Sequence, residues 1–217
     1  MQQQAVLAFR QQYRQAIAAY YRGWLHGAWV FGTGLLGIVL AALQLHNVTA
    51  LTWLVLPATL LFANLAEYIA HRYLGHHKSR ILPLFYKRHT GDHHSFFDEE
   101  LFYFENNRDL RVVFFPVYLI YAFIFLLIFP VGFALCYLGF YNAAALFAIG
   151  ALSGYLLYEL LHFSYHIPGN NPFRFIPGWG WLRDLHQYHH RHGAMQHFNF
   201  NITLPLVDVL LGTYKRR

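Results

Sequence analysis

The chain has 217 residues, of which 57% are hydrophobic and 12% are charged, and its formal net charge is +6. A soluble globular domain usually carries about 25% charged residues, so the composition argues against a soluble protein, while the length fits one domain. A positive charge on a membrane protein reflects its orientation and its contact with anionic headgroups, so it gives no reason to expect a nucleic-acid partner. The single cysteine, Cys136, excludes an intramolecular disulfide framework.

Residues 5–22 have the pattern of an amphipathic helix near the N-terminus. Arg10 and Arg14 are four residues apart and therefore share one helical face, as they would in a helix lying at a membrane interface. We therefore interpret residues 1–22 as an amphipathic N-terminal segment. A simple continuation of the first membrane span is the alternative.

Two long stretches without Lys, Arg, Asp or Glu follow, at residues 23–66 and 112–158. A continuous helix over the first stretch would extend about 66 Å, roughly twice the hydrocarbon thickness of a bilayer. Each stretch therefore predicts a helical hairpin, with turn signals at residues 46–47 and 139–142. The predicted fold is all-α and integral to the membrane, with four transmembrane helices at about residues 25–45, 48–70, 112–137 and 143–165.

The segments outside these spans contain all 16 basic residues, and with an even number of spans they share one side of the membrane. The positive-inside rule makes this the cytoplasmic side, where both termini are also expected. Residues 71–111 and 166–217 are therefore predicted to form a cytoplasmic helical cap, with a short helix at about residues 181–192. The cap and the spans together form a single membrane-embedded domain over residues 1–217.

Histidine is the most informative residue type in this chain. Of the 15 histidines, 11 fall in four short windows, at residues 71–77, 89–94, 162–166 and 186–190. The first and third windows end the second and fourth spans, and the other two lie in the cap segments that follow. All four windows therefore reach the same side of the membrane, where their side chains can converge. Outside the windows we expect ordinary hydrogen-bonded side chains for His26, His46, His192 and His197.

The spacing inside the windows suits metal ligands. His162 and His166 share a helical face, as do the three histidines of the fourth window, because residues three or four apart are neighbours on a helix. His71 and His76 are about 140° apart around an ideal α-helix, so this pair needs a distorted helix to bind one ion. Imidazole is a neutral ligand suited to zinc, copper, iron or nickel, and ten imidazoles exceed the four ligands of a structural zinc site. Such a set would serve two metal ions.

Four carboxylates lie close to these windows in the sequence. A metal-bound histidine usually donates its second N–H to a carboxylate or a carbonyl. Glu67 and Glu159 lie three or four residues before a span-ending histidine, on its helical face, so both are predicted to support the ligands in this way. For Asp92 and Asp184 the same role and that of an exposed surface carboxylate are both open.

The four windows resemble the histidine boxes of the fatty acid hydroxylase / sterol desaturase superfamily. In that family the first box has three or four residues between two histidines, and later boxes end in paired histidines. The stretch from Asn199 to Tyr214 is similar to the family's ending after the last box, except that Val207 stands where a tryptophan usually precedes the aspartate. The resemblance covers most of the chain, from about residue 67 to residue 214.

The resemblance implies a four-span bundle with a cytoplasmic cap around two iron ions, with zinc as a possible occupant in purified or overexpressed protein. It also implies O₂-dependent attack on an unactivated C–H bond of a lipid, such as a fatty acyl chain or a sterol, and reduction by a separate electron-donor protein. The ligands that it implies are His71, His76, His89, His93, His94, His162, His166, His186, His189 and His190. His77 is the alternative to His76, because family members differ in that spacing.

Functions from other classes stay open at this point. A metal transporter would place polar ligands near the middle of broken helices, whereas these spans contain few polar residues. A zinc-stabilised membrane scaffold would need no open coordination position. The number of histidines and their position at one end of the spans favour an enzyme, but the residues alone do not distinguish hydroxylation from desaturation.

Overall fold

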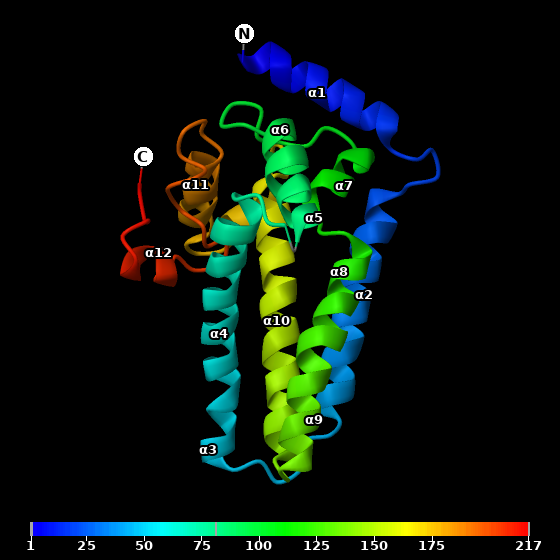
Figure 1. Ribbon diagram of the computed structural model, residues 1–217, viewed down its shortest axis with the longest axis vertical. Coiled ribbons are helices and arrows are strands. Elements are labelled where there is room, and N and C mark those ends of the chain that lie inside the picture. Colours follow the sequence, from blue (N-terminus) through cyan, green and yellow to red (C-terminus); the bar gives the residue numbers. More distant parts are fainter. Residues whose placement is uncertain (1, 81, 217) are drawn as a thin grey trace.

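The computed structural model describes residues 2–80 and 82–216, and every regular element in this part of the chain is a helix. Figure 1 shows long helices running side by side and a group of short helices gathered at one end of them. Four segments are long and apolar enough to cross a membrane, namely Gly23–Ala42, Ala50–Gly75, Asn107–Tyr137 and Tyr141–Tyr165. The predicted all-α integral membrane fold is therefore confirmed.

The first segment is α2 (Gly23–Ala42), and the second contains α3 (Ala50–Trp53), α4 (Val55–Ile69) and the π-helical turn η1 (Ala70–Gly75). The third contains η3 (Asn107–Asp109), α7 (Leu110–Val113), α8 (Val117–Phe123), η4 (Ile124–Ile128) and α9 (Phe129–Tyr137). The fourth is α10 (Tyr141–Tyr165). The other helices are α1 (Gln2–Ala16), α5 (Pro83–Tyr86), η2 (Lys87–His93), α6 (His94–Phe96), η5 (Pro172–Phe175), α11 (Trp179–His189) and α12 (Leu206–Leu210).

Helix α10 is the centre of the bundle and packs against α4, α2 and α9. Two glycines on one face of α10, four residues apart, allow the close approach of α4. A Cβ added at Gly150 would lie 2.8 Å from the Cβ of Thr59, and one added at Gly154 would lie 2.7 Å from the Cβ of Ala63. Small residues at this spacing let the backbones of membrane helices approach closely. The contact brings together the cap ends of α4, which continues into η1 with His71, and of α10, which contains His162.

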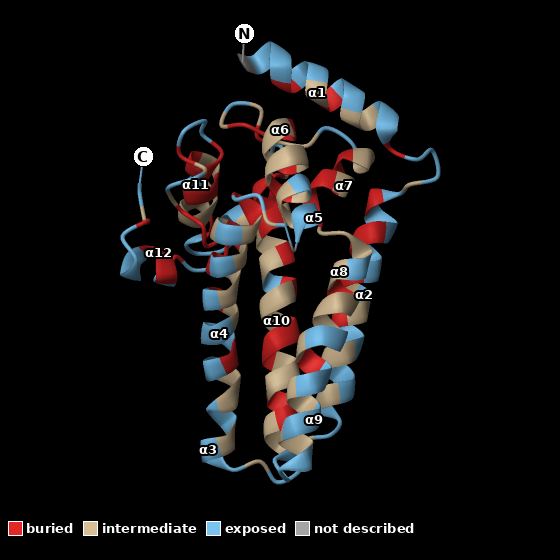
Figure 2. Cartoon of the chain, viewed as in Figure 1, coloured by how far each residue is buried: buried red, intermediate tan, exposed pale blue. Residues whose placement is uncertain are grey.

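The outer surface of the bundle is apolar. Large hydrophobic side chains such as Leu61, Leu126 and Phe133 are more than half exposed. In Figure 2 the outward faces of α2, α4 and α9 carry many exposed residues, whereas α10 contains buried ones along its length. This distribution is the one that lipid contact requires, because hydrocarbon rather than water surrounds the outside of a spanning bundle.

The short helices form a cap, which we define as residues 76–106, apart from residue 81, and 166–216. Its interior is rich in aromatic side chains, including Phe96, Phe97 and Phe102, which are fully buried. Helix α1 lies across the outer end of the cap and contacts α6 (Figure 1). It ends at Ala16, earlier than the predicted residue 22, and residues 17–22 are not helical.

Helices α1 and α2 are separated by a non-helical segment, because the start of α2 is held against Asn107. The backbone N–H of Trp24 donates to the Oδ1 of Asn107 at 2.9 Å. A Cβ added at Gly23 would lie 2.1 Å from the carbonyl oxygen of Asn107, so only glycine permits this approach. The helix α1 is therefore a separate element that packs on the cap, and it is not a continuation of the first span.

Candidate metal centre

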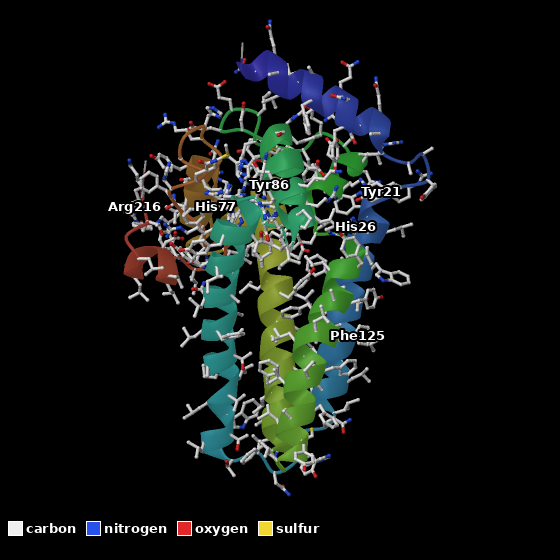
Figure 3. All side chains as sticks on the ribbon, in the orientation of Figure 1. Tyr21, His26, His77, Tyr86, Phe125 and Arg216 are labelled. Atoms are coloured by element: carbon white, nitrogen blue, oxygen red, sulfur yellow. The ribbon has the colours of Figure 1, made fainter. Side chains whose placement is uncertain are left out.

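The structure brings nine of the ten predicted ligands into two groups of buried imidazoles at the cap end of the spans. Within each group, one ring nitrogen from every histidine lies within 4.8 Å of the others. Group one contains His71, His76, His89, His94 and His189, and group two contains His93, His166, His186 and His190. The tenth residue, His162, lies beside group two with its Nε2 3.2 Å from that of His93. Figure 3 shows polar side chains gathered at this end of the molecule, whereas those along the lower bundle are mostly carbon.

Group one depends on two π-helical turns. His71 and His76 are connected through η1, and His89 and His94 through η2. A π-helix makes i→i+5 hydrogen bonds, so residues five apart lie above one another instead of on different faces. The ring centroids of these pairs are consequently 5.1 Å and 4.7 Å apart. This is the helix distortion that the five-residue spacing of the first window requires.

Group two draws on ordinary α-helical spacing. His162 and His166 stand at the end of α10, and His186 and His190 stand at the end of α11, each pair four residues apart. Their ring centroids are 5.1 Å and 4.7 Å apart, respectively. The type of helix therefore matches the spacing within each of these four pairs, whereas His93 enters group two from η2 and His189 enters group one from α11. The groups also adjoin, because the rings of His94 and His190 have centroids only 4.3 Å apart.

Backbone carbonyls fix the orientation of five of these rings through Nδ1. The pairs are His71 with Phe200, His189 with Phe198 at 2.7 Å, His93 with Val112 at 3.0 Å, His166 with Phe102 at 2.6 Å and His190 with Phe97 at 3.2 Å. A carbonyl oxygen only accepts, so each of these Nδ1 atoms must carry the hydrogen. A neutral imidazole has one N–H, so the Nε2 atom of each of these rings carries a lone pair, which is directed into its group.

The contact between His93 and His190 shows why a cation fits this arrangement. Their Nε2 atoms lie 3.1 Å apart, yet neither can donate to the other because both rings carry their hydrogen on Nδ1. Two nitrogens bound to one metal ion at about 2.1 Å and nearly at right angles would lie about 3.0 Å apart. Other Nε2 pairs in both groups lie 3.0–3.2 Å apart. The Nε2 of His71 is buried without a hydrogen-bond partner, as expected for a metal ligand.

The protonation state of the rings agrees with this reading. Burial lowers the pKa of His93 to about 3 and that of His189 to about 4, from an ordinary value of 6.5. Burial also lowers the pKa values of His89 and His186 well below that value, and neighbouring imidazoles add to the effect. At neutral pH these rings are uncharged, which is the state in which histidine binds a metal.

The comparison with known families settles the class of the protein. The sequence matches the family model described as "Fatty acid hydroxylase" over residues 56–213, well over half of the chain. The chain belongs to the fatty acid hydroxylase family. No curated protein and no solved structure matches the sequence. The matched region of this fatty acid hydroxylase family member contains all ten predicted ligands, and it excludes α1 and α2.

The remaining histidines lie outside both groups. His77 is exposed and its Nδ1 bonds to the carbonyl of Arg72 at 2.8 Å, so group one contains His76 instead. His26 lies on α2, where its ring bonds to the hydroxyl of Tyr21 at 2.8 Å and to the carbonyl of Phe115 at 2.9 Å. Figure 3 labels His26 beside Tyr21 at the cap end of α2, and His77 within the cap.

The two glutamates that were predicted to support the ligands accept hydrogen bonds from backbone N–H groups and not from the histidine rings. Glu67 accepts hydrogen bonds from the backbone N–H groups of Ile202 and Thr203 and from the Thr203 hydroxyl. Glu159 accepts from the backbone N–H of Phe115 at 3.2 Å. The Nδ1 of His71 bonds to a carbonyl in the loop that Glu67 holds, so this glutamate contacts the ligand through the loop.

Asp92 and Asp184 pair with arginines instead of histidines. Asp92 forms an ion pair with Arg88 at 2.7 Å, four residues earlier on the same turn. Asp184 forms one with its neighbour Arg183 at 2.6 Å, and its side chain is half exposed. These contacts speak against the support of ligands for both aspartates, but only Asp184 is an exposed surface carboxylate, because the side chain of Asp92 is 16% exposed.

Sequence reasoning missed the carbonyls that orient the rings and the groups that hold them. Asp208 is fully buried and accepts from the backbone N–H groups of Phe200 and Asn201, at 2.9 and 2.7 Å. It also accepts from the hydroxyl of Thr213 at 2.7 Å. Asp208 therefore shapes the loop whose carbonyls face His71 and His189. The family-like ending of the chain contains this aspartate, which was the available signal for it.

The candidate metal centre of this family member has contrasting surroundings on its two sides. Toward the spans, His162 stacks on Tyr158 and Tyr158 stacks on Phe115, with ring centroids 5.7 and 5.2 Å apart. Toward the cap surface, a cavity of about 530 Å³ reaches one histidine of each group, His94 and His190. Its other lining residues are Ala5, Val6, Phe9, Ser95, Asp98, His192 and Met195. The centre therefore has an aromatic side toward the bilayer and a mixed polar side toward the cap.

Proposed function

We propose that this protein catalyses the O₂-dependent oxidation, by hydroxylation or desaturation, of a C–H bond in a lipid such as a fatty acyl chain or a sterol. The observation that carries the proposal is the pair of adjoining imidazole groups with inward Nε2 lone pairs, in a chain of the fatty acid hydroxylase family. We assign the ten histidines as ligands of two iron ions, five from group one and five from group two with His162 included. A C–H bond of a hydrocarbon needs a redox metal, and histidine-rich sites with open positions suit iron.

Bound iron supplies the redox chemistry with dioxygen, and the chain's own residues supply geometry and environment. Carbonyls of Phe97, Phe102 and Phe200 hold the Nδ1 hydrogens and thereby aim the Nε2 lone pairs of three ligands inward. Burial keeps the ligands uncharged, which is the state in which histidine binds a metal. Both effects leave few alternative states for the ligands, which is what a preorganised metal site requires.

The surroundings of the centre support a lipid substrate. The side of the centre toward the spans carries the stacked rings of Tyr158 and Phe115, so an apolar chain that reached this side from the bilayer would meet aromatic groups. Small polar reactants have a separate route through the cap cavity that ends at His94 and His190. Hydroxylation inserts one oxygen atom into the substrate and reduces the other to water, so electrons must come from a donor outside this chain. We propose a separate electron-donor protein for that role.

We further propose that the cap, the metal centre and both termini lie on the cytoplasmic side. The basic residues lie outside the four spans or, as with Arg72, Arg108 and Arg111, at their cap ends, and the two loops at the opposite end contain none. The positive-inside rule assigns the end with the basic residues to the cytoplasm. An acidic electron donor could dock there by charge complementarity, which mainly accelerates association.

The test is elemental analysis of protein purified in mild detergent, followed by turnover assays. We expect two iron ions per chain, one for each group, and an oxidised product when a lipid, O₂ and a reductant are supplied. A single zinc ion, or no metal in protein that is folded and inserted, would contradict the proposal and favour a scaffold or a transporter. A product labelled from ¹⁸O₂ would identify hydroxylation, whereas a double bond without label would identify desaturation.

A further inference from the structure

Helix α1 places one buried arginine against the loop that runs from α6 into η3. Arg10 is only 2% exposed, although it lies on a helix at the surface of the cap. Its guanidinium donates to three carbonyls of this loop, those of Phe96 at 2.8 Å, Leu101 at 2.6 Å and Tyr103 at 3.2 Å. It also bonds to Glu105 at 2.7 Å. A planar guanidinium with several donors is suited to fixing more than one carbonyl at once.

The same loop orients two rings of group two. Its Phe97 carbonyl accepts from the Nδ1 of His190, and its Phe102 carbonyl accepts from the Nδ1 of His166. Each of these carbonyls is adjacent in the chain to one that Arg10 holds. The ring of His166 also lies against the rings of Phe97 and Phe102, with centroids 4.3 and 4.4 Å apart. A shift of the loop would therefore move both histidines.

Group one has a corresponding loop that is held from a different part of the chain. There the carbonyls of Phe198 and Phe200 face His189 and His71, and the loop is held by Asp208 and Glu67. Both of those carboxylates lie within residues 56–213, the region that matches the family. Arg10, which holds three carbonyls at the loop of group two, lies in α1, outside that region, whereas Asp98 inside it accepts from the N–H groups of Glu100 and Leu101 in the same loop.

We propose that Arg10 is a positioning residue for group two, through which α1 sets the metal affinity of that group. The inference rests on metal binding by both groups, as proposed above, and does not depend on the oxidation chemistry. Partners that orient metal ligands typically change metal affinity about 10- to 100-fold when they are removed. Loss of Arg10 is therefore expected to weaken the ion in group two by that factor and to leave the ion in group one in place.

The experiment is a titration of metal-free, detergent-purified protein with Co²⁺, followed by its visible absorption and by competition with a chelator. Wild-type protein is expected to bind two ions, and Arg10→Gln is expected to lose affinity about 10- to 100-fold at one of them. Arg22→Gln is the matched control, because Arg22 is an exposed arginine near the same end of the chain that donates to the neighbouring carbonyls of Ala19 and Tyr21 instead of to this loop. Arg10→Lys restores part of the donors and should recover part of the affinity.

Two further variants identify which ion is lost. Arg10→Gln combined with His189→Ala, a group one change, should bind no tight ion, whereas its combination with His93→Ala should keep the remaining one. Equal affinities of Arg10→Gln and wild type, or an equal loss at both ions, would overturn the role of Arg10. Wild-type protein that binds no Co²⁺ would overturn the proposed metal centre as well. If Arg10→Gln does not fold, Arg10→Lys decides by the same criteria.

Discussion

Removal of the Glu67 carboxylate tests how strongly the metal centre depends on its supporting loop. In Glu67→Ala the backbone N–H groups of Ile202 and Thr203 lose their acceptor. Each buried N–H that is left unpaired costs about 1–3 kcal/mol, so the free energy of unfolding should fall by about 2–6 kcal/mol. Glu67→Gln keeps one oxygen in place for both N–H groups and should cost about 1–2 kcal/mol, because the hydrogen bonds lose their charge assistance.

The consequence for metal binding follows from the position of the loop. Phe200, two residues before Ile202, holds the Nδ1 of His71 through its carbonyl. We expect Glu67→Ala to weaken the ion of group one about 10- to 100-fold, and Glu67→Gln to lie at the low end of that range. Chelator competition gives the affinity of each ion, and thermal unfolding of the same metal-free samples gives the stability. A folded Glu67→Ala protein with unchanged affinity at group one would refute the reasoning and reduce Glu67 to a purely structural role.

Three further predictions concern the histidines themselves. His189→Ala and His93→Ala should each remove the ion of its own group, and with it activity, without preventing membrane insertion, and full metal content in both would contradict the ligand assignment. In the folded protein the pKa of His93 is about 3 and that of His189 is about 4. Below about pH 6.5 these two histidines are therefore protonated in the unfolded chain while they are still neutral in the folded chain. The metal-free protein should therefore lose up to about 1.4 kcal/mol of stability per pH unit and per histidine as the pH falls from about 6.5 toward those values, as denaturant titrations at two pH values would show. A Cβ at Gly75 would lie 2.8 Å from the ring of His89, whereas one at Gly91 would meet nothing closer than 3.9 Å. Gly75→Ala should therefore weaken the ion of group one and Gly91→Ala should not, and equal affinities in the two variants would speak against the packing argument.

The fold was accessible from the sequence because the bilayer imposes a simple rule on it. Charge-free stretches at residues 23–66 and 112–158 are too long for one crossing, and the structure turns within each of them. The second and third spans begin or end several residues nearer the cap than predicted, because the polar ends of these helices, such as Ala70–Gly75, remain helical. Hydropathy marks where a helix meets lipid, and it does not mark where the helix stops.

The composition of the candidate site was accessible for a different reason. The histidines of the four windows were expected to converge, and the structure gathers nine of the eleven into groups one and two, with His162 beside group two and His77 outside both. Their assignment as metal ligands remains a prediction, which the metal measurements above test.

The sequence could not reveal which partner each ring would use. Every residue has a backbone carbonyl, so the sequence does not show which carbonyl a ring will bond to. His71 bonds to the carbonyl of Phe200, where Glu67 was expected as its partner. The role of Arg10 was equally hidden, because a buried arginine on an amphipathic helix looks the same as a surface one until its loop is placed.

The π-helical turns at η1 and η2 have a consequence for how such a centre can change over time. A π turn is equivalent to an α-helix that has absorbed one additional residue without rotating the rest of the helix. One inserted residue between His71 and His76 is thus accommodated locally, and both rings still face group one. The resemblance includes first boxes with either three or four intervening residues, and this geometry accounts for both lengths. A single-residue insertion or deletion, which would misalign most helical sites, is here a change that the metal centre can survive.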